Sequence, residues 1–210
     1  MATENTGNVT AVVAWDYSFD SGLREVPKSP SAMSNGIEQL KASLPSLNNA
    51  ELAKTYGLIG GYSRIMGNLE QSKHYLELAV AAYQNMGDAV GAFINELRLA
   101  HTLQWAGNYQ QADALFLRLI SGAEAYAQLN PYLDFAYQHY GKSLFDQKDY
   151  AEALAFFHKA LTLRLLKSNY ELTASTKQAI HLCTQKLNLT TSEARMNDKQ
   201  NISDYAWPSS

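Results

Sequence analysis

The sequence predicts an all-α protein built from stacked pairs of helices, and three observations support this. A turn motif recurs at spacings of 40 and 41 residues, as Gly67-Asn68-Leu69, Gly107-Asn108-Tyr109 and Lys148-Asp149-Tyr150. Apolar residues on both sides of each turn lie three and four positions apart, which is typical of amphipathic helices. The third observation is that the flanking positions repeat in register. They are Ile59-Gly60, Leu99-Ala100 and Tyr140-Gly141 before the turn, Ser72, Ala112 and Ala153 after it, and then Leu76, Phe116 and Phe157, followed by Ala79, Leu119 and Ala160.

Each repeated position has a physical role in a pair of helices. Glycine at the turn tolerates the left-handed conformation that ends a helix, and the Asn or Asp that follows caps the next helix. Small residues on facing helices let the two axes approach closely, and bulky ones fill the space toward the neighbouring pair. No pair can bury its apolar faces alone, so three or more must stack into one core. Lys148 departs from the pattern, because it occupies the position of the turn glycine.

The units can be placed along the chain from these signals. Asn35-Gly36-Ile37-Glu38 predicts a capping box that opens a short helix through Leu44, with Pro45 stopping it. Asn130-Pro131 predicts a cap followed by proline at the first helical position. The expected organisation is an N-terminal tail at 1–32, a helical repeat domain at 33–187 with units at about 49–87, 88–127 and 130–169 and a capping helix at 171–187, and a C-terminal tail at 188–210.

Composition excludes several classes of protein. The formal net charge of −3 provides no bulk basic field, so we expect no nucleic-acid partner. No apolar run approaches the 18 residues or so of a membrane-spanning helix, so we expect no membrane partner. The single cysteine, Cys183, excludes an intramolecular disulfide and favours a reducing compartment, which predicts a cytoplasmic protein with this thiol buried and inert.

The repeated positions resemble those of the tetratricopeptide repeat, a helix-turn-helix unit that is usually about 34 residues long. The period of 40 to 41 is similar to that of the longer repeats of kinesin light chains and of bacterial peptide-sensing regulators. Ala160–Arg164, continuing through Glu171–Thr173 to Ala179, is similar to the linker of the kinesin-light-chain type. The resemblance covers roughly residues 48 to 187 and implies a right-handed α-α superhelix of three units with extra terminal helices. It also implies that the chain binds proteins or peptides.

In such a superhelix the first helix of each unit lines a concave face, and the helical period identifies its inward positions. Four permanent cations face one carboxylate on this surface, with aromatic and aliphatic groups between them. A surface of this kind suits a peptide with acidic and bulky side chains. The candidate peptide-binding residues are Lys54, Arg64, Arg98, His101, Trp105, Phe135, His139 and Lys142. The alternative is that these charges only solvate an exposed helix face.

The sequence offers no catalytic, cofactor or metal site. Gly57-Leu58-Ile59-Gly60-Gly61 is rich in glycine but lacks the Gly-Lys-Ser/Thr of a phosphate-binding loop. The five histidines are scattered along the chain, and none has another histidine or a cysteine three or four residues away. We therefore expect a non-catalytic binding protein. Self-association as a homodimer, through terminal helices or tails, is the alternative function.

Both predicted tails contain an aromatic and acidic cluster, at residues 15–20 and 204–208. Their charge and apolarity complement the predicted groove, so one tail could bind there in its own chain or in a neighbour. The preferred interpretation is instead that the aromatic residues cover the open ends of the array, because terminal repeats need shielding. A strand near 11–19 is also possible, but it would need another strand to pair with.

Overall fold

The computed structural model describes residues 16–20 and 22–204, with their side chains except at 191 and 193–204. The described residues form eight α-helices, two 3-10 turns and a two-stranded hairpin. The α-helices are α1 (Pro30–Ser43), α2 (Asn49–Ile65), α3 (Leu69–Asn85), α4 (Ala89–Trp105), α5 (Tyr109–Ala125), α6 (Leu133–Asp146), α7 (Tyr150–Leu166) and α8 (Tyr170–Asp204); the 3-10 turns are η1 (Leu44–Ser46) and η2 (Asn130–Tyr132); and the strands are β1 (Tyr17–Phe19) and β2 (Glu25–Pro27).

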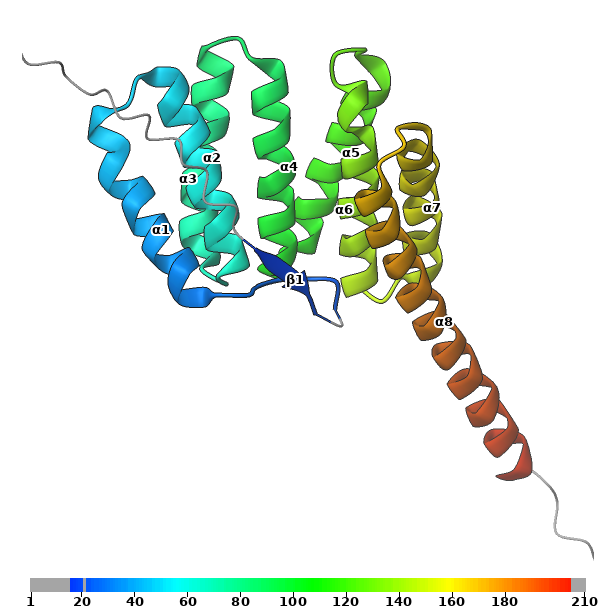
Figure 1. Ribbon diagram of the computed structural model, residues 1–210. Helices are drawn as coiled ribbons and strands as arrows, with labels where there is room; N and C mark the ends of the chain where they lie inside the picture. The colour runs from blue at the N-terminus through cyan, green and yellow to red at the C-terminus, as the bar shows by residue number, and fades with distance from the viewer. Residues whose placement is uncertain (1–15, 21, 205–210) are drawn as a thin grey trace, which may run out of the picture.

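The helices pack against their neighbours in chain order and form an array, as the sequence predicted (Figure 1). The pairs α2 with α3, α4 with α5 and α6 with α7 are the three expected units. Contacts between α2 and α4 and between α4 and α6 join the first helices of successive units into one face. The all-α repeat architecture is therefore confirmed.

The turns between helices have the predicted chemistry except at Asn108, whose side chain makes no capping hydrogen bond. Asn68 and Asp88 each accept a hydrogen bond from the backbone three residues later, and so does Asp149. The glycine before the first of these caps, Gly67, has a φ of +78°. Lys148 takes the same left-handed conformation with a φ of +67°, so a lysine occupies a conformation that favours glycine.

The repeated positions form the core. All three small positions after the turn and all three bulky positions are fully buried. Gly60 packs directly on Leu76, since a Cβ built at Gly60 would lie 2.5 Å from Leu76 Cγ. Gly141 packs in the same way on Phe157, at 2.7 Å from Cε1. The repeating columns therefore mark the contact between the two helices of each unit.

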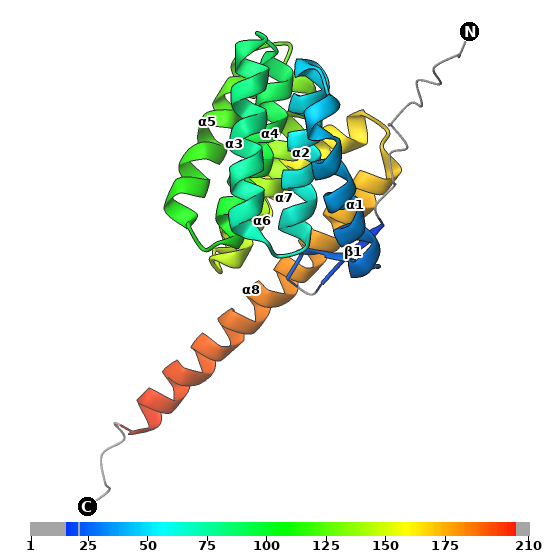
Figure 2. The same cartoon turned by 90° about the vertical axis from the view of Figure 1, so that its left-hand side faces the viewer.

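The ends of the array differ from the predicted boundaries. Helix α1 begins at Pro30, ahead of the expected capping box at Asn35, because proline at the first helical position already has a helical φ. Helix α8 continues to Asp204, whereas the capping helix was expected to end at 187. No glycine or proline interrupts this segment. Figures 1 and 2 both show the second half of α8 extending away from the packed helices.

The N-terminal segment is a short antiparallel hairpin. Strand β1 pairs with β2 in a register that places Tyr17 opposite Pro27 and Phe19 opposite Glu25. The turn is closed by the Asp20 side chain, which accepts from the backbone of Gly22. The hairpin provides the pairing partner that an isolated strand would lack, and it lies across the ends of helices in the middle of the array (Figure 1).

Candidate protein-binding groove

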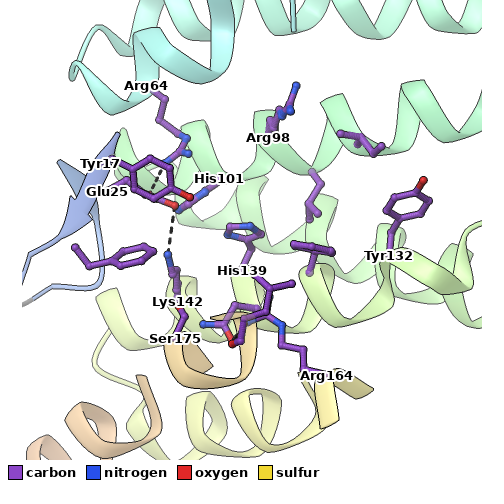
Figure 3. Close-up of a pocket in the computed structure, with 16 residues that line it drawn as sticks. Tyr17, Glu25, Arg64, Arg98, His101, Tyr132, His139, Lys142, Arg164 and Ser175 are labelled. Carbon is purple, nitrogen blue, oxygen red and sulfur yellow. Dashed lines mark hydrogen bonds and ion pairs between the residues drawn. The ribbon is translucent and has the colours of Figure 1, made fainter. Parts of the chain in front are cut away.

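The hairpin places one carboxylate in the concave face of the array, from β2 (Figure 3). Glu25 forms ion pairs with Arg64 of α2, at 2.8 Å from Nη1, and with Lys142 of α6, at 3.4 Å from Nζ. The three side chains are only 7%, 8% and 6% exposed, respectively. Burial alone would raise the pKa of Glu25, but Arg64, followed by Lys142 and two histidines, holds it well below its usual range. A buried anion is thus stabilised between cations from the first and third units.

Two buried histidines lie beside this carboxylate and are called the histidine pair: His101 of α4 and His139 of α6. Their ring centroids are 4.4 Å apart. Trp105 donates its indole N–H to His101 Nε2 at 3.1 Å, so this nitrogen acts as an acceptor. Burial lowers the pKa of both histidines well below the usual value, and nearby cations, chiefly Arg64 and Lys142, lower it further. The histidine pair is therefore neutral near pH 7.

Further contacts hold the hairpin in the groove. Arg24 forms an ion pair with Asp146 of α6 at 2.8 Å and lies over the Trp105 ring, 5.2 Å from its centroid. Lys142 lies 4.6 Å from the centroid of Phe19. The hairpin therefore contributes one anion, one cation and one aromatic ring to contacts with the groove.

Beside the hairpin a cavity of about 370 Å³ remains, which we call the open half of the groove (Figure 3). Its walls come from the hairpin and from α2, α4, η2, α6, α7 and the first turns of α8. The residues that line it are Tyr17, Phe19, Glu25, Arg64, Ile94, Leu97, Arg98, His101, Tyr132, Phe135, Gln138, His139, Lys142, Arg164, Leu172 and Ser175.

Arg98 gives the open half a cation that no carboxylate of the described residues pairs with. Its Nη1 donates to the Gly57 carbonyl and to Asn95 Oδ1, both at 3.3 Å. Burial, and then the proximity of Arg64, lowers the pKa of Arg98 from its ordinary value. A guanidinium bound only to neutral acceptors in a cavity favours an anionic ligand.

Two polar atoms of the α6 residues that line the open half have no hydrogen-bond partner among the described residues. One is Nε2 of Gln138, whose residue is only 3% exposed, and the other is Nδ1 of His139. The Gln138 amide is oriented by its oxygen, which accepts from Arg164 Nη1 at 3.1 Å and from the Thr176 hydroxyl at 3.0 Å. Arg164 itself is paired with Asp134 at 3.0 Å. The Gln138 amide therefore offers a donor to any acceptor that enters the cavity.

The structure brings together most of the residues that the sequence nominated. Of the eight, the six that line the cavity are Arg64, Arg98, His101, Phe135, His139 and Lys142. Trp105 does not line the cavity but packs beneath the hairpin against Arg64, at 4.7 Å from its ring centroid. Lys54 is exposed and lies outside the cavity.

From the sequence, binding of the N-terminal cluster in the groove was only the less favoured alternative. The interpretation that the aromatic clusters cover the ends of the array is wrong for Tyr17 and Phe19, which line the groove. Trp15 and Trp207 lie outside the described residues. The excess of cations at the inward positions was the signal that could have located Glu25, the acidic residue that pairs with two of them. Arg164 was also missed, because it lies on the second helix of its unit.

The structure also describes the surroundings of the cysteine and the possibilities for metal binding and membrane crossing. The Cys183 thiol is buried and donates to the Tyr150 carbonyl at 3.2 Å, and burial raises its pKa to about 11, as expected of a core cysteine. Within residues 16–20 and 22–204, no group of three or more His, Cys, Asp or Glu side chains is placed to hold a metal ion. None of the helices that the structure describes has the length and apolar character needed to cross a membrane.

The fold and the groove define a helical-repeat protein whose concave face is built from the first helix of each unit. The tetratricopeptide repeat family matches residues 136–165, which lie within the third unit. The structure is also similar to the crystal structure of BtubC (BKLC) from P. vanneervenii, with a TM-score of 0.54 and 12% sequence identity over 85% of this chain and 77% of that one. No curated protein matches the sequence. Residues 136–165 thus match the tetratricopeptide repeat, a family that generally mediates protein–protein interactions and is typically non-catalytic, and the similarity to the solved structure shows a shared helical-repeat fold across the array.

Proposed function

We propose that this protein is a scaffold that binds a segment of another protein in its concave groove, and that the segment carries an acidic side chain next to a bulky apolar one. The observation that supports this most directly is the groove's own contact with the hairpin. Glu25 is buried between Arg64 and Lys142, while Phe19 lies against Lys142. A short acidic and aromatic peptide strand therefore already fits this surface.

The open half has the same chemistry. Arg98 supplies a cation for a carboxylate, and Gln138 supplies an amide donor beside it. The apolar part of the wall includes Ile94, Phe135 and Leu172, which suits an aromatic or branched side chain. A volume of about 370 Å³ lies within the usual range for ligand pockets, roughly 300 to 1,000 Å³. The open half is thus a second position on the groove for a side chain of the kind that the hairpin presents.

Selection from a random peptide library tests this function without naming the partner in advance. Wild type should enrich peptides with Asp or Glu close to Trp, Tyr, Phe or Leu. An Arg98→Gln variant should lose this enrichment. Removal of one partner from a buried charged pair weakens binding by about 30-fold or more. Lys54→Gln is the matched control, since it removes an exposed cation of the same face outside the cavity. Absence of any enrichment with wild type would contradict the proposed function.

A further inference from the structure

We propose that the open half of the groove binds the acidic and aromatic segment at residues 204–208 of a second copy of this chain. This inference rests on the proposed function and names one occupant of the same site. It predicts that the protein associates head to tail, with the C-terminal segment of one molecule in the groove of the next.

The two aromatic and acidic clusters of the sequence have the same chemistry. The cluster at 15–20 contains aromatic residues alternating with aspartates, and its Tyr17 and Phe19 line the groove. The cluster at 204–208 reads Asp-Tyr-Ala-Trp-Pro, so it also combines a carboxylate with two aromatic rings. The chain therefore carries two segments suited to this groove, and the first occupies only half of it.

The open half of the groove complements the segment at 204–208 in both charge and apolar character. Asp204 would supply the carboxylate that Arg98 lacks among the described residues, with the Gln138 amide as a second donor. Trp207 follows three residues later and would contact the apolar wall near Ile94 and Phe135. Aromatic anchors of this kind dominate the energetics of protein interfaces.

Helix α8 keeps the C-terminal segment of a chain from reaching its own groove. Ser175 lines the cavity and lies on the same continuous helix as Asp204. These residues are 29 positions apart, which corresponds to about 44 Å along α8. Trp207 can lie at most about 11 Å from Asp204 even in a fully extended chain. With α8 continuous to Asp204, this reach is too short to return to the cavity of the same molecule, and Figures 1 and 2 show α8 leading away from the array.

An association of this type joins unlike surfaces, so its geometry differs from that of a symmetric dimer. Each molecule offers one groove and one C-terminal segment, and a head-to-tail contact produces a ring or an open chain of molecules. The mass of the wild-type protein should therefore rise beyond that of a dimer as its concentration increases.

Complementation between two kinds of variant provides the test, with the full-length protein throughout. Arg98→Gln disables the groove, and Ser175→Trp fills the cavity from α8 as a second groove variant in case the first folds poorly. Asp204→Asn combined with Trp207→Ala disables the segment and changes no residue that lines the cavity. Each groove variant and the segment variant should be monomeric alone by sedimentation velocity. An equimolar mixture of a groove variant and the segment variant should form a 1:1 dimer and nothing larger.

A labelled peptide of residues 200–210 adds a direct measurement. It should bind the segment variant, and the Arg98→Gln substitution should weaken this binding by about 30-fold or more. The Lys54→Gln substitution should leave it unchanged. Association that persists in both groove variants would overturn the inference, and so would a monomeric wild type at about 100 μM that does not bind the peptide. If library peptides still bind through Arg98 in that case, the inference fails while the proposed function stands.

Discussion

Replacement of Glu25 by glutamine tests how strongly the hairpin is held in the groove. The carboxylate is 7% exposed and pairs with Arg64 at 2.8 Å and Lys142 at 3.4 Å. Glutamine keeps the size of the side chain but leaves two buried cations without their anion. Removal of one partner from a buried ion pair typically costs about 3 to 5 kcal/mol. The hairpin can, however, leave the groove and let water reach both cations, so the loss should appear as local opening before it appears as global unfolding.

Native-state hydrogen exchange measures this opening directly. The amides of Asp20 and Lys28 donate across the hairpin to the Arg24 and Asp16 carbonyls, at 2.9 and 3.1 Å. In Glu25→Gln we expect the opening constant at these amides to increase by about 100-fold or more, which corresponds to the lower end of the cost of breaking a buried pair. Amides in the core of α4 and α6 should change much less.

Lys28→Gln is the matched control for this experiment. It removes the hairpin's exposed ion pair, in which Lys28 and Asp16 are 55% and 68% exposed. Exposed pairs contribute at most about 1 kcal/mol, so opening should increase by no more than about fivefold. Unchanged protection in Glu25→Gln, or equal effects of the two substitutions, would show that the buried carboxylate does not hold the hairpin.

Three further predictions concern the array. The free energy of unfolding should fall as the pH drops below about 6.5, because the unfolded chain takes up protons that the buried imidazoles do not. The decrease is up to about 1.4 kcal/mol per pH unit for each member of the histidine pair. Urea denaturation from about pH 8 to about pH 5 measures it, and a flat profile would contradict it. Gly60→Ala should destabilise the fold by about 1 to 3 kcal/mol, because the new methyl group overlaps Leu76. Gly61→Ala meets no atom within 4 Å and should stabilise the fold by about 0.5 to 1 kcal/mol. Thermal unfolding compares the two variants, and equal shifts in their melting temperatures would show that packing at Gly60 is not tight. Lys148→Gly should raise stability by about 1 kcal/mol in the same assay, since φ is +67° there; a loss would mean that the lysine side chain makes a compensating contact.

The helical array and the lining of its groove could be predicted from local sequence signals. The period of 40 to 41 residues, the turn chemistry and the small and bulky columns each depend on residues close in the chain. The inward face followed from the helical period once those columns were known. This is why Arg98 and His139, from different units, could be nominated together before the structure placed both at one cavity.

The tertiary structure alone decided what occupies that groove. Glu25 lies 39 residues from Arg64 and 117 from Lys142, so no local pattern links them. The same holds for Arg164, whose partners Asp134 and Gln138 belong to another helix. Periodicity identifies which face of a helix is inward, because side-chain direction repeats every 3.6 residues. Which distant segment neutralises the charges on that face depends on the path of the chain through space, and that path is set by the packing of the whole array.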